Sequence, residues 1–303
     1  MSPSSRRGGE SVLLVVVNTQ KTDLTLALLK NLSGLKGMDK VKVLVVDNQS
    51  TPRTRAELRR GFRLHPRLRT RLVASPENLG YFGAFRRGVR AEKGRQYRWT
   101  IISNDDIAIP DRDFFVRLQS YDPGFAGVLG PDILSEETGV HQNPFREARF
   151  SPRQMLFYRA MHASFSVARA LAWVSRRLHG LKGRTGAGGR PAPAPSGPRR
   201  VYAVHGAFMI FGRDYFDKGG IIDANYFMYG EENTVSEAAH RLSVDVVFDP
   251  RLKVIHQEHG TLGKAFTRKT FDRQKEAFRY FSKHYFFSGL DTESFKKQLG
   301  RLA

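Results

Sequence analysis

Two acidic clusters in this sequence have the residue types and spacing that metal-assisted chemistry needs. The first is Asn104-Asp105-Asp106, which follows the apolar run at residues 97–102. Adjacent carboxylates beside a buried strand are costly unless a cation neutralises them. Mg²⁺ or Mn²⁺ typically takes one or two carboxylates together with substrate phosphates, so this cluster suits a metal–diphosphate complex. The alternative is a solvated turn in which Asp111 only caps the next helix.

The second cluster is Glu231-Glu232, which follows an aromatic run and opens a helical segment. A carboxylate at this position could accept a proton from a substrate hydroxyl, while the positive end of the helix steadies its charge. Acids also favour the first turn of a helix on electrostatic grounds alone, so a purely structural role is the alternative.

Three weaker signals accompany these clusters. The segment 47–50 is either a ligand-binding strand end or an Asx-type turn. Asn78 and Gly80 precede a helix whose backbone N–H groups could approach an anion, although a plain turn has the same composition. His256 and His259 could be metal ligands, bind phosphate or be structural. The chain has no cysteine, so a metal site would use oxygen and imidazole, a combination that suits Mn²⁺.

The first 130 residues alternate between strand and helix patterns. Strands are predicted at residues 12–17, 41–46, 71–74, 97–102 and 125–129, and helices at 23–32, 53–64, 81–93 and 111–118. This alternation predicts βαβ units and a mostly parallel α/β sheet, which binds ligands beyond the carboxyl ends of its strands. Polar residues stand at four of those ends, namely Asn18, Asp47, Asn78 and Asn104, which together indicate a site.

The second half of the chain is less regular. A helical stretch broken once is predicted at 151–181, a Gly/Pro/Arg-rich loop at 183–200, an apolar segment at 201–211, a helix at 234–242, a strand at 244–248 and an aromatic helix at 268–287. We therefore divide the chain into a first half (11–130), a basic helical insertion (149–200), a second half of the same domain (201–263) and a C-terminal helical segment (264–303).

The charge of the chain is strongly positive. Its 303 residues carry 50 Lys and Arg against 29 Asp and Glu, a formal net charge of +21, and no acid stands between Glu147 and Asp214. Such an excess suits nucleotide phosphates, nucleic acid or an acidic membrane. The start of the chain lacks the apolar core of a signal peptide, and no apolar run reaches membrane-spanning length. We expect a cytoplasmic protein, with a peripheral position at the inner face of the cell membrane as the alternative.

Taken together, these segments resemble the inverting glycosyltransferases of family two, which share the GT-A fold. The motifs stand at residues 15–18 (Val-Val-x-Asn), 46–50 (Val-Asp-Asn-x-Ser), 78–81 (Asn-x-Gly-aromatic), 104–106 (Asn-x-Asp), 206–209 (Gly-Ala-x-Met) and 227–232 (aromatic-x-Tyr-x-Glu-acid). The resemblance extends from Val12 to about Gly263, and it is closest to bacterial rhamnosyltransferase-like and O-antigen-type members.

The resemblance implies that residues 11–130 form the nucleotide-sugar-binding half of the domain and residues 201–263 its acceptor or catalytic half. It also implies a role for each matched residue. In the nucleotide pocket, Asp47 would contact the base, and the other members would be Asn18, Asn48, Ser50, Asn78, Gly80, Asn104 and Asp105. Asp106 would bind a divalent cation, Mg²⁺ or Mn²⁺, together with His256. Glu232 would be the catalytic base, with Glu231 beside it. Departures from the family pattern stand at Phe85, Arg86, Thr234 and Ala238.

The implied reaction is a single displacement with inversion. It moves a sugar from a nucleoside-diphosphate donor, UDP- or dTDP-linked, to a glycan or lipid-linked acceptor in bacterial surface polysaccharide synthesis. No G-x-G-x-x-G follows the first strand, which argues against a dinucleotide-dependent oxidoreductase. No Gly-rich loop with Arg and Lys follows it either, which argues against a nucleotidyltransferase. A basic nucleic-acid- or membrane-binding protein, with nucleic acid the less favoured partner, and a degenerate sugar-nucleotide binder remain as alternatives.

Overall fold

The first half of the chain builds a parallel sheet. The computed structural model describes residues 11–122, 124–170, 197–258 and 267–303. Strands β1 (Val12–Asn18), β2 (Val41–Asn48), β3 (Arg69–Ser75) and β4 (Trp99–Asn104) lie in the order β3-β2-β1-β4, all parallel. β1 is buried along its whole length, as its run of Val and Leu predicts for a strand covered on both faces.

The second half extends the same sheet and changes its direction once. β8 (Phe208–Gly212) lies antiparallel between β4 and β6 (Val128–Ser135), and β6 pairs in parallel with β9 (Val246–His256). The short strands β5 (Ile107–Ala108) and β7 (Arg199–Arg200) both pair antiparallel with β9. The sheet is therefore mostly parallel, as the sequence predicts, with β8 as its one long antiparallel strand in the described residues.

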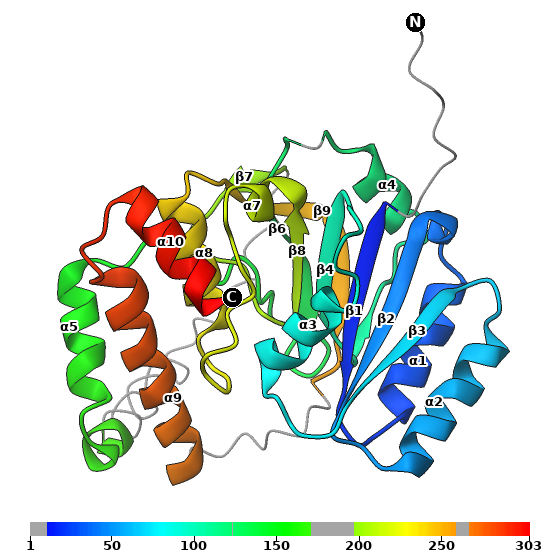
Figure 1. The fold of residues 1–303 in the computed structure, drawn as a ribbon, viewed down its shortest axis with the longest axis horizontal. Helices are drawn as coiled ribbons and strands as arrows, with labels where there is room; N and C mark the ends of the chain where they lie inside the picture. The colour runs from blue at the N-terminus through cyan, green and yellow to red at the C-terminus, as the bar shows by residue number, and fades with distance from the viewer. Residues whose placement is uncertain (1–10, 123, 171–196, 259–266) are drawn as a thin grey trace, which may run out of the picture.

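Helices cover both faces of the sheet (Figure 1). α1 (Asp23–Ser33) and α4 (Phe114–Ser120) pack on the face that carries Val12, Leu14 and Val16. α2 (Pro52–Leu64) packs beside α1 and β3. α3 (Tyr81–Arg90) and α8 (Glu231–Arg241) pack on the opposite face, against Leu13, Val15 and Val17. Alternate side chains of β1 thus pack into two separate hydrophobic cores, one on each face of the sheet, as a three-layer α/β domain requires.

A helical lobe stands beside the second half of the sheet (Figure 1). It contains α5 (Pro152–Met161), α9 (Arg268–Phe281), the π-helical turn η2 (Ser282–Phe286) and α10 (Thr292–Leu302). α5 begins with a capping box formed by Ser151 and Gln154. Aromatic rings join α5 to α9, since the Tyr158 and Phe278 centroids lie 6.3 Å apart. Short segments elsewhere are η1 (Met38–Lys40) and α7 (Arg213–Asp217).

Several predicted boundaries differ from the structure. β6 runs over Val128–Ser135, not 125–129, because Asp122 and Gly124 form a turn before it. β9 continues to His256, passing Pro250 where three of its residues bulge out of register with β6. α8 begins at Glu231 rather than at 234. The aromatic helix predicted at 268–287 consists of α9 and η2, and α10 is a separate helix within the C-terminal segment 264–303.

Within residues 151–170, the predicted helical stretch is interrupted at residues 162–164, and helix resumes at 165–170. The rest of that stretch lies outside the described residues, as does most of the predicted loop at 183–200. Within the described part of the chain, no helix is long and apolar enough to cross a membrane.

A buried ion pair anchors the entry to the helical lobe. Arg149 donates to both carboxylate oxygens of Glu237 on α8, at 2.9 and 2.6 Å, and Tyr202 donates to the same carboxylate at 2.8 Å. The Glu237 side chain is fully buried, whereas Arg149 is partly exposed. Breaking a buried pair leaves an uncompensated charge, which costs more than the pair itself contributes.

We therefore expect Arg149→Met to lower the free energy of unfolding by about 3 kcal/mol, measured by urea denaturation. The double variant Arg149→Met/Glu237→Gln should recover part of that loss, because no charge then remains buried. Arg213→Met, which removes a surface pair with Asp217, is the control and should cost at most about 1 kcal/mol. Equal losses in the two single variants would contradict this account.

Candidate active site

The carboxyl ends of the parallel strands bring the predicted polar residues together. Asn18 pairs in register with Asp47, and Val17 with Asn104, so these side chains occupy neighbouring ends of β1, β2 and β4. Asn18 is fully buried, and its amide donates to the Ser50 hydroxyl at 3.3 Å. The strand-end residues predicted from sequence therefore form one contiguous corner.

Thr25 on α1 connects this corner to the acidic cluster. Its hydroxyl lies 2.9 Å from Asn18 Oδ1 and 3.2 Å from Asp105 Oδ2. Burial, and secondarily the neighbouring Asp106 carboxylate, raise the pKa of Asp105 to about 7. A cation bound beside the pair would reverse this shift, because it favours the charged form. Thr25 was not predicted as a site residue, and only the structure of α1 brings it here.

Asp47 has one carboxylate oxygen held by the protein and one free for a ligand. Oδ1 accepts from the Ser50 backbone N–H at 3.1 Å, which fixes the loop after β2. Oδ2 is buried without a hydrogen-bond donor among the described residues, and its nearest cation is Arg55 Nε at 3.7 Å. A buried acceptor without a donor is costly, so this atom is suited to the N–H of a bound base.

Asn48, Asn78 and Gly80 form the adjoining loop. The Asn48 amide group donates to Asn78 Oδ1 at 3.1 Å and accepts from the Leu79 backbone at 2.9 Å. Gly80 has φ +73°, and a Cβ there would lie 2.3 Å from the carbonyl oxygen of Phe227. Glycine is thus required by both its backbone conformation and this close approach. The contact fastens the loop to the segment that precedes Glu231 and Glu232.

Asp106 and His256 meet because β5 pairs with the end of β9. Ile107 is the register partner of His256, and the His256 Nε2 to Asp106 Oδ1 distance is 3.3 Å. Asp106 is only 2% exposed, and its Oδ1 has no hydrogen-bond partner among the described residues. Asn104 Nδ2 lies 3.4 Å from the same Nε2.

Residues behind His256 set which ring nitrogen faces Asp106. His256 Nδ1 lies 2.9 Å from Gln142 Oε1, and the Gln142 amide nitrogen donates to Glu258 at 2.7 Å. Gln142 Oε1 is therefore the acceptor, so Nδ1 carries a proton. In the neutral ring, the Nε2 lone pair then faces the Asp106 carboxylate. Two electron-rich atoms at this distance are stabilised by a cation that binds both of them.

The protein thus offers a divalent cation one carboxylate and one imidazole, and substrate phosphates would complete the coordination shell. Within the described ranges, no group of three or more His, Asp or Glu side chains forms a ready-made cage. His259 lies outside the described residues.

The two glutamates of the second cluster have different surroundings. Glu231 is 4% exposed, and burial, with the neighbouring Glu232, raises its pKa to about 8. Glu232 is half-buried, accepts from the Gly206 backbone N–H at 3.0 Å, and lines a cavity of about 520 Å³ beside α5 and α9. Glu232 is therefore the member of the pair that an acceptor molecule can reach. Tyr229 lies two residues before Glu231 and has a left-handed φ of 75°, which bulky residues rarely adopt.

Tyr81 joins the two acidic clusters. Its buried hydroxyl lies 2.7 Å from the carbonyl oxygen of Gly206 and also contacts Asn104 Oδ1. Gly206 in turn donates to Glu232, so one ring spans the space between Asn104 and Glu232. Burial and the surrounding carboxylates raise the pKa of Tyr81, which keeps its hydroxyl protonated. The aromatic position of the 78–81 motif was the one signal for this residue in the sequence.

His205 also faces this space. Its ring centroid lies 6.0 Å from that of His256, and its Nδ1 accepts from the Ala207 backbone N–H. Burial lowers the pKa of His205, although Glu232 opposes that effect. The sequence analysis did not select it.

The sheet order, the acidic strand end after β4 and the carboxylates opening α8 define a glycosyltransferase of the GT-A fold. The model of Glycosyl transferase family 2 matches residues 11–179, more than half of the chain. The chain therefore belongs to glycosyl transferase family 2. No curated protein sequence matches it significantly.

Solved glycosyltransferases share its fold at low identity. A mannosyltransferase from Pyrobaculum calidifontis, in complex with GDP-Man and Mn²⁺, is 17% identical with TM-score 0.50, covering 96% of this chain and 73% of that one. S. aureus TarS 1-349 with UDP-GlcNAc is 12% identical with TM-score 0.56, covering 96% and 71%. GalNAc-T7 with UDP, GalNAc and Mn²⁺ is 14% identical with TM-score 0.55, and this chain spans 54% of its length.

The raised pKa of Glu231 predicts a pH-dependent stability. The folded carboxyl stays protonated up to about pH 8, whereas the unfolded one loses its proton near the ordinary value of 4.5. Between these values the unfolded state binds fewer protons, so the free energy of unfolding falls as pH rises. Glu231→Gln does not titrate and escapes this fall.

We compare the Tm of Glu231→Gln with that of wild type, both in EDTA. The variant's Tm minus the wild-type Tm should be more than about 2 °C larger at pH 8 than at pH 5. Glu276→Gln, at an exposed position of α9, is the control and should show a constant difference. A constant difference for Glu231→Gln as well would show that this carboxyl is already ionised in the folded protein.

Proposed function

We propose that this glycosyltransferase moves a sugar from a UDP- or dTDP-linked donor to an acceptor hydroxyl, with inversion at the anomeric carbon. The observation that carries the proposal is the position of Glu232 between the carboxyl edge of the sheet and an open cavity. Glu232 takes the acceptor proton as the acceptor oxygen bonds to the anomeric carbon. The bond from that carbon to the diphosphate oxygen breaks in the same displacement, and the nucleoside diphosphate leaves.

The proposed donor subsite lies at the strand ends. The buried, undonated Oδ2 of Asp47 recognises the base, and Asn18 and Ser50 hold the ribose side of the pocket. Asn48, Asn78 and Gly80 shape the loop around the nucleotide. Asn104 and Asp105 lie where the diphosphate group would extend from the nucleoside.

Asp106 and His256 are the proposed ligands of Mg²⁺ or Mn²⁺. The unpartnered Asp106 Oδ1 and the lone pair of His256 support this assignment. The cation would neutralise charge on the leaving diphosphate. Gln142 and Glu258 keep His256 in the tautomer that a metal ligand needs. The mannosyltransferase structure contains GDP-Man and Mn²⁺, and the GalNAc-T7 structure contains UDP, GalNAc and Mn²⁺, which agrees with this chemistry.

The acceptor is a glycan or a lipid-linked molecule in this proposal, and the setting is bacterial surface polysaccharide synthesis. Both follow from the resemblance to O-antigen-type members. We also propose that the cytoplasmic protein docks peripherally on an anionic membrane. Leu156 and Phe157 on α5 are 58% and 55% exposed beside Arg153 and Arg159, a combination typical of interfacial helices.

Donor recognition and catalysis are tested with two variants. A screen of UDP-, dTDP- and GDP-sugars should give metal-dependent thermal stabilisation with one nucleotide, and Asp106→Asn should abolish the metal dependence. Glu232→Gln should lower kcat by about 10²–10⁴-fold while donor binding stays intact, because it removes only the proton acceptor. Nucleoside diphosphate release measures kcat.

Asp111→Asn is the matched control. Asp111 is the acid that a solvated turn would use, and it accepts from the Asp113 backbone at 2.9 Å. Its replacement should leave donor binding and kcat within about twofold, since it removes neither the proposed base nor a proposed metal ligand. If no donor binds with either metal, a basic nucleic-acid-binding protein replaces this proposal. A donor that binds but is never turned over would indicate a degenerate sugar-nucleotide binder. A Glu232→Gln enzyme with unchanged kcat would move the base elsewhere.

Membrane docking is tested by liposome flotation. Vesicles rich in phosphatidylglycerol should carry the protein, pure phosphatidylcholine should not, and Leu156→Gln/Phe157→Gln should reduce flotation severalfold because it removes the exposed apolar side chains. Equal flotation with both lipids would overturn docking on an anionic surface.

A further inference from the structure

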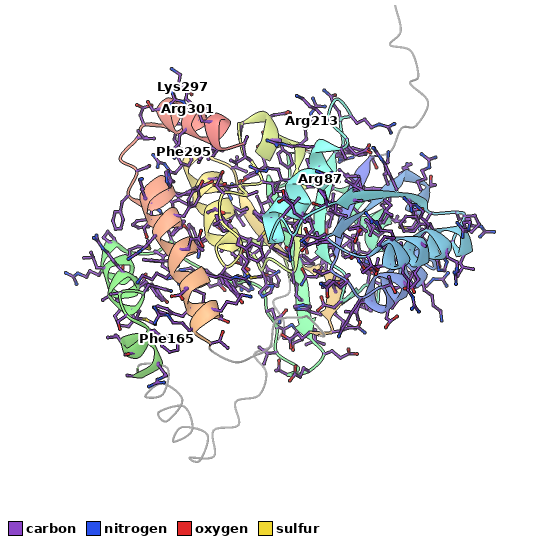
Figure 2. The ribbon with its side chains drawn as sticks, turned by 60° about the horizontal axis from the view of Figure 1, so that its bottom comes forward. Arg87, Phe165, Arg213, Phe295, Lys297 and Arg301 are labelled. Atoms are coloured by element: carbon purple, nitrogen blue, oxygen red, sulfur yellow. The ribbon has the colours of Figure 1, made fainter. Side chains whose placement is uncertain are left out.

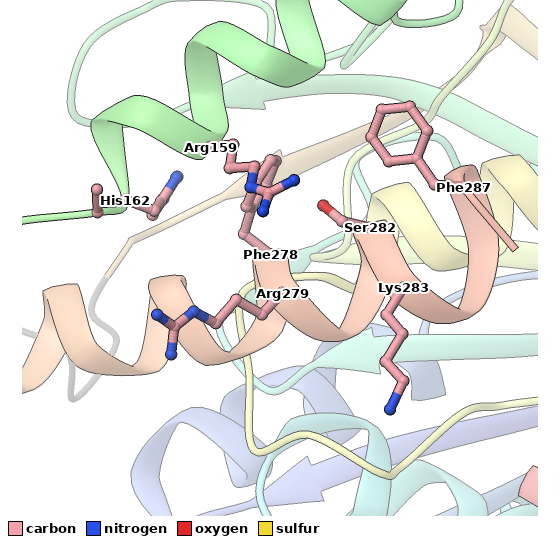
Figure 3. Close-up of a pocket in the computed structure, with 8 residues that line it drawn as sticks. Arg159, His162, Phe278, Arg279, Ser282, Lys283 and Phe287 are labelled. Carbon is pink, nitrogen blue, oxygen red and sulfur yellow. The ribbon is translucent and has the colours of Figure 1, made fainter.

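Two cavities lie between α5 and the C-terminal helices, and they share a wall. The first, of about 520 Å³, contains Glu232 and is lined by the rings of Phe150 and Tyr158. We call it the base cavity. The second, of about 420 Å³, is lined by Arg159, Arg279 and Lys283, and we call it the cation cavity. Figure 3 shows that Arg159 and His162 come from the end of α5, whereas Phe278, Arg279 and Lys283 come from α9 and η2.

The wall between the cavities is one aromatic pair. His162 and Phe278 line both cavities, and their rings stack with centroids 4.8 Å apart at 10°. His162 Nδ1 is held by the Tyr158 carbonyl oxygen at 2.8 Å, and burial lowers the pKa of this imidazole. The wall is therefore apolar and uncharged, and its thickness is a single layer of side chains.

The three cations of the second cavity have no hydrogen-bond or ion-pair partner in the part of the chain that the structure describes. Arg159, Arg279 and Lys283 make no hydrogen bond or ion pair with another described residue. The sequence from 148 to 213 contains no acid that could pair with them, and Glu276, exposed one turn before Arg279, forms no ion pair with it. Three unpaired cations around an apolar pocket favour a ligand that is anionic at one end and apolar behind it.

We infer that the acceptor is an anionic amphiphile that occupies both cavities. Its hydroxyl lies at Glu232, its apolar part covers the His162–Phe278 pair, and its phosphate or carboxylate lies among Arg159, Arg279 and Lys283. The inference rests on the proposed function and specifies the acceptor class. In the reaction the acceptor oxygen bonds to the sugar, its proton goes to Glu232, and the anionic end stays unchanged.

The proposal is tested by calorimetric titration of octyl phosphate below its micelle concentration. Octyl glucoside, with the same chain and no charge, and inorganic phosphate, with charge and no chain, are the comparison probes. Wild type should bind octyl phosphate at least about tenfold more tightly than either, since only that probe satisfies both the apolar wall and the cations. Arg279→Gln/Lys283→Gln should lose most of that preference.

Lys297→Gln/Arg301→Gln is the matched control. These two exposed cations, labelled in Figure 2, stand four residues apart on α10, as Arg279 and Lys283 do along α9 and η2. Neither of them lines the base cavity or the cation cavity. The control should bind octyl phosphate within about twofold of wild type, because long-range charge alone contributes little at physiological salt. An equal loss in both double variants would reduce the effect to net charge and overturn the proposal.

The remaining outcomes separate this inference from its alternatives. Equal binding of octyl phosphate and octyl glucoside would show that the cations hold no ligand. Binding of anionic vesicles without binding of monomeric octyl phosphate would assign the cations to a membrane surface. Donor binding is measured in parallel: if it persists while octyl phosphate fails to bind, only the acceptor class is wrong, whereas loss of donor binding in wild type would overturn the proposed function itself.

Discussion

Negative charge concentrated at the carboxyl edge of the sheet is the constraint on which the site depends. Asp105 and Asp106 are adjacent, Glu231 is buried, and Glu232 stands beside it. Burial raises the pKa of Asp105 to about 7 and that of Glu231 to about 8, and among the described residues no donor reaches one oxygen each of Asp47, Asp106 and Glu231. Buried carboxylates of this kind are stabilised by protons, cations or ligand N–H groups, so this edge is suited to a polar ligand.

The two halves of the domain are fixed to one another at a few positions. Gly80 lies so close to the Phe227 carbonyl that a Cβ would clash with it, and the Tyr81 backbone N–H donates to the same carbonyl oxygen at 3.0 Å. Arg149 and Glu237 connect the helical lobe to α8. Through these contacts the loop proposed to hold the nucleotide, the proposed base and the cavities beside α5 keep one geometry, which is the preorganisation that displacement chemistry requires.

Much of the edge could be predicted from sequence, because parallel strands place their carboxyl ends side by side. Asn18, Asp47 and Asn104 follow directly from that rule. Thr25 and Gln142 could not be predicted, since their positions depend on helix packing and on a loop that reaches β9. The antiparallel β8 was also missed: its five residues are buried and apolar, and such a run carries no information about strand direction. The aromatic wall depends on packing between α5 and α9, which are more than a hundred residues apart in the sequence.

The placement of β8 has a consequence for synthesis on the ribosome. β4 and β6 precede it in the chain, yet neither pairs with the other; each pairs with β8. A nascent chain that has emerged only to residue 200 therefore exposes an open β4 edge and an unpaired β6, the features that recruit chaperones or cause aggregation. The corner around Asp47 can form early, but Glu232 and His256 emerge after β8 closes the sheet. Vectorial folding thus completes the acidic edge only after His256 has emerged, so a chain that ends before β9 cannot carry the assembled site.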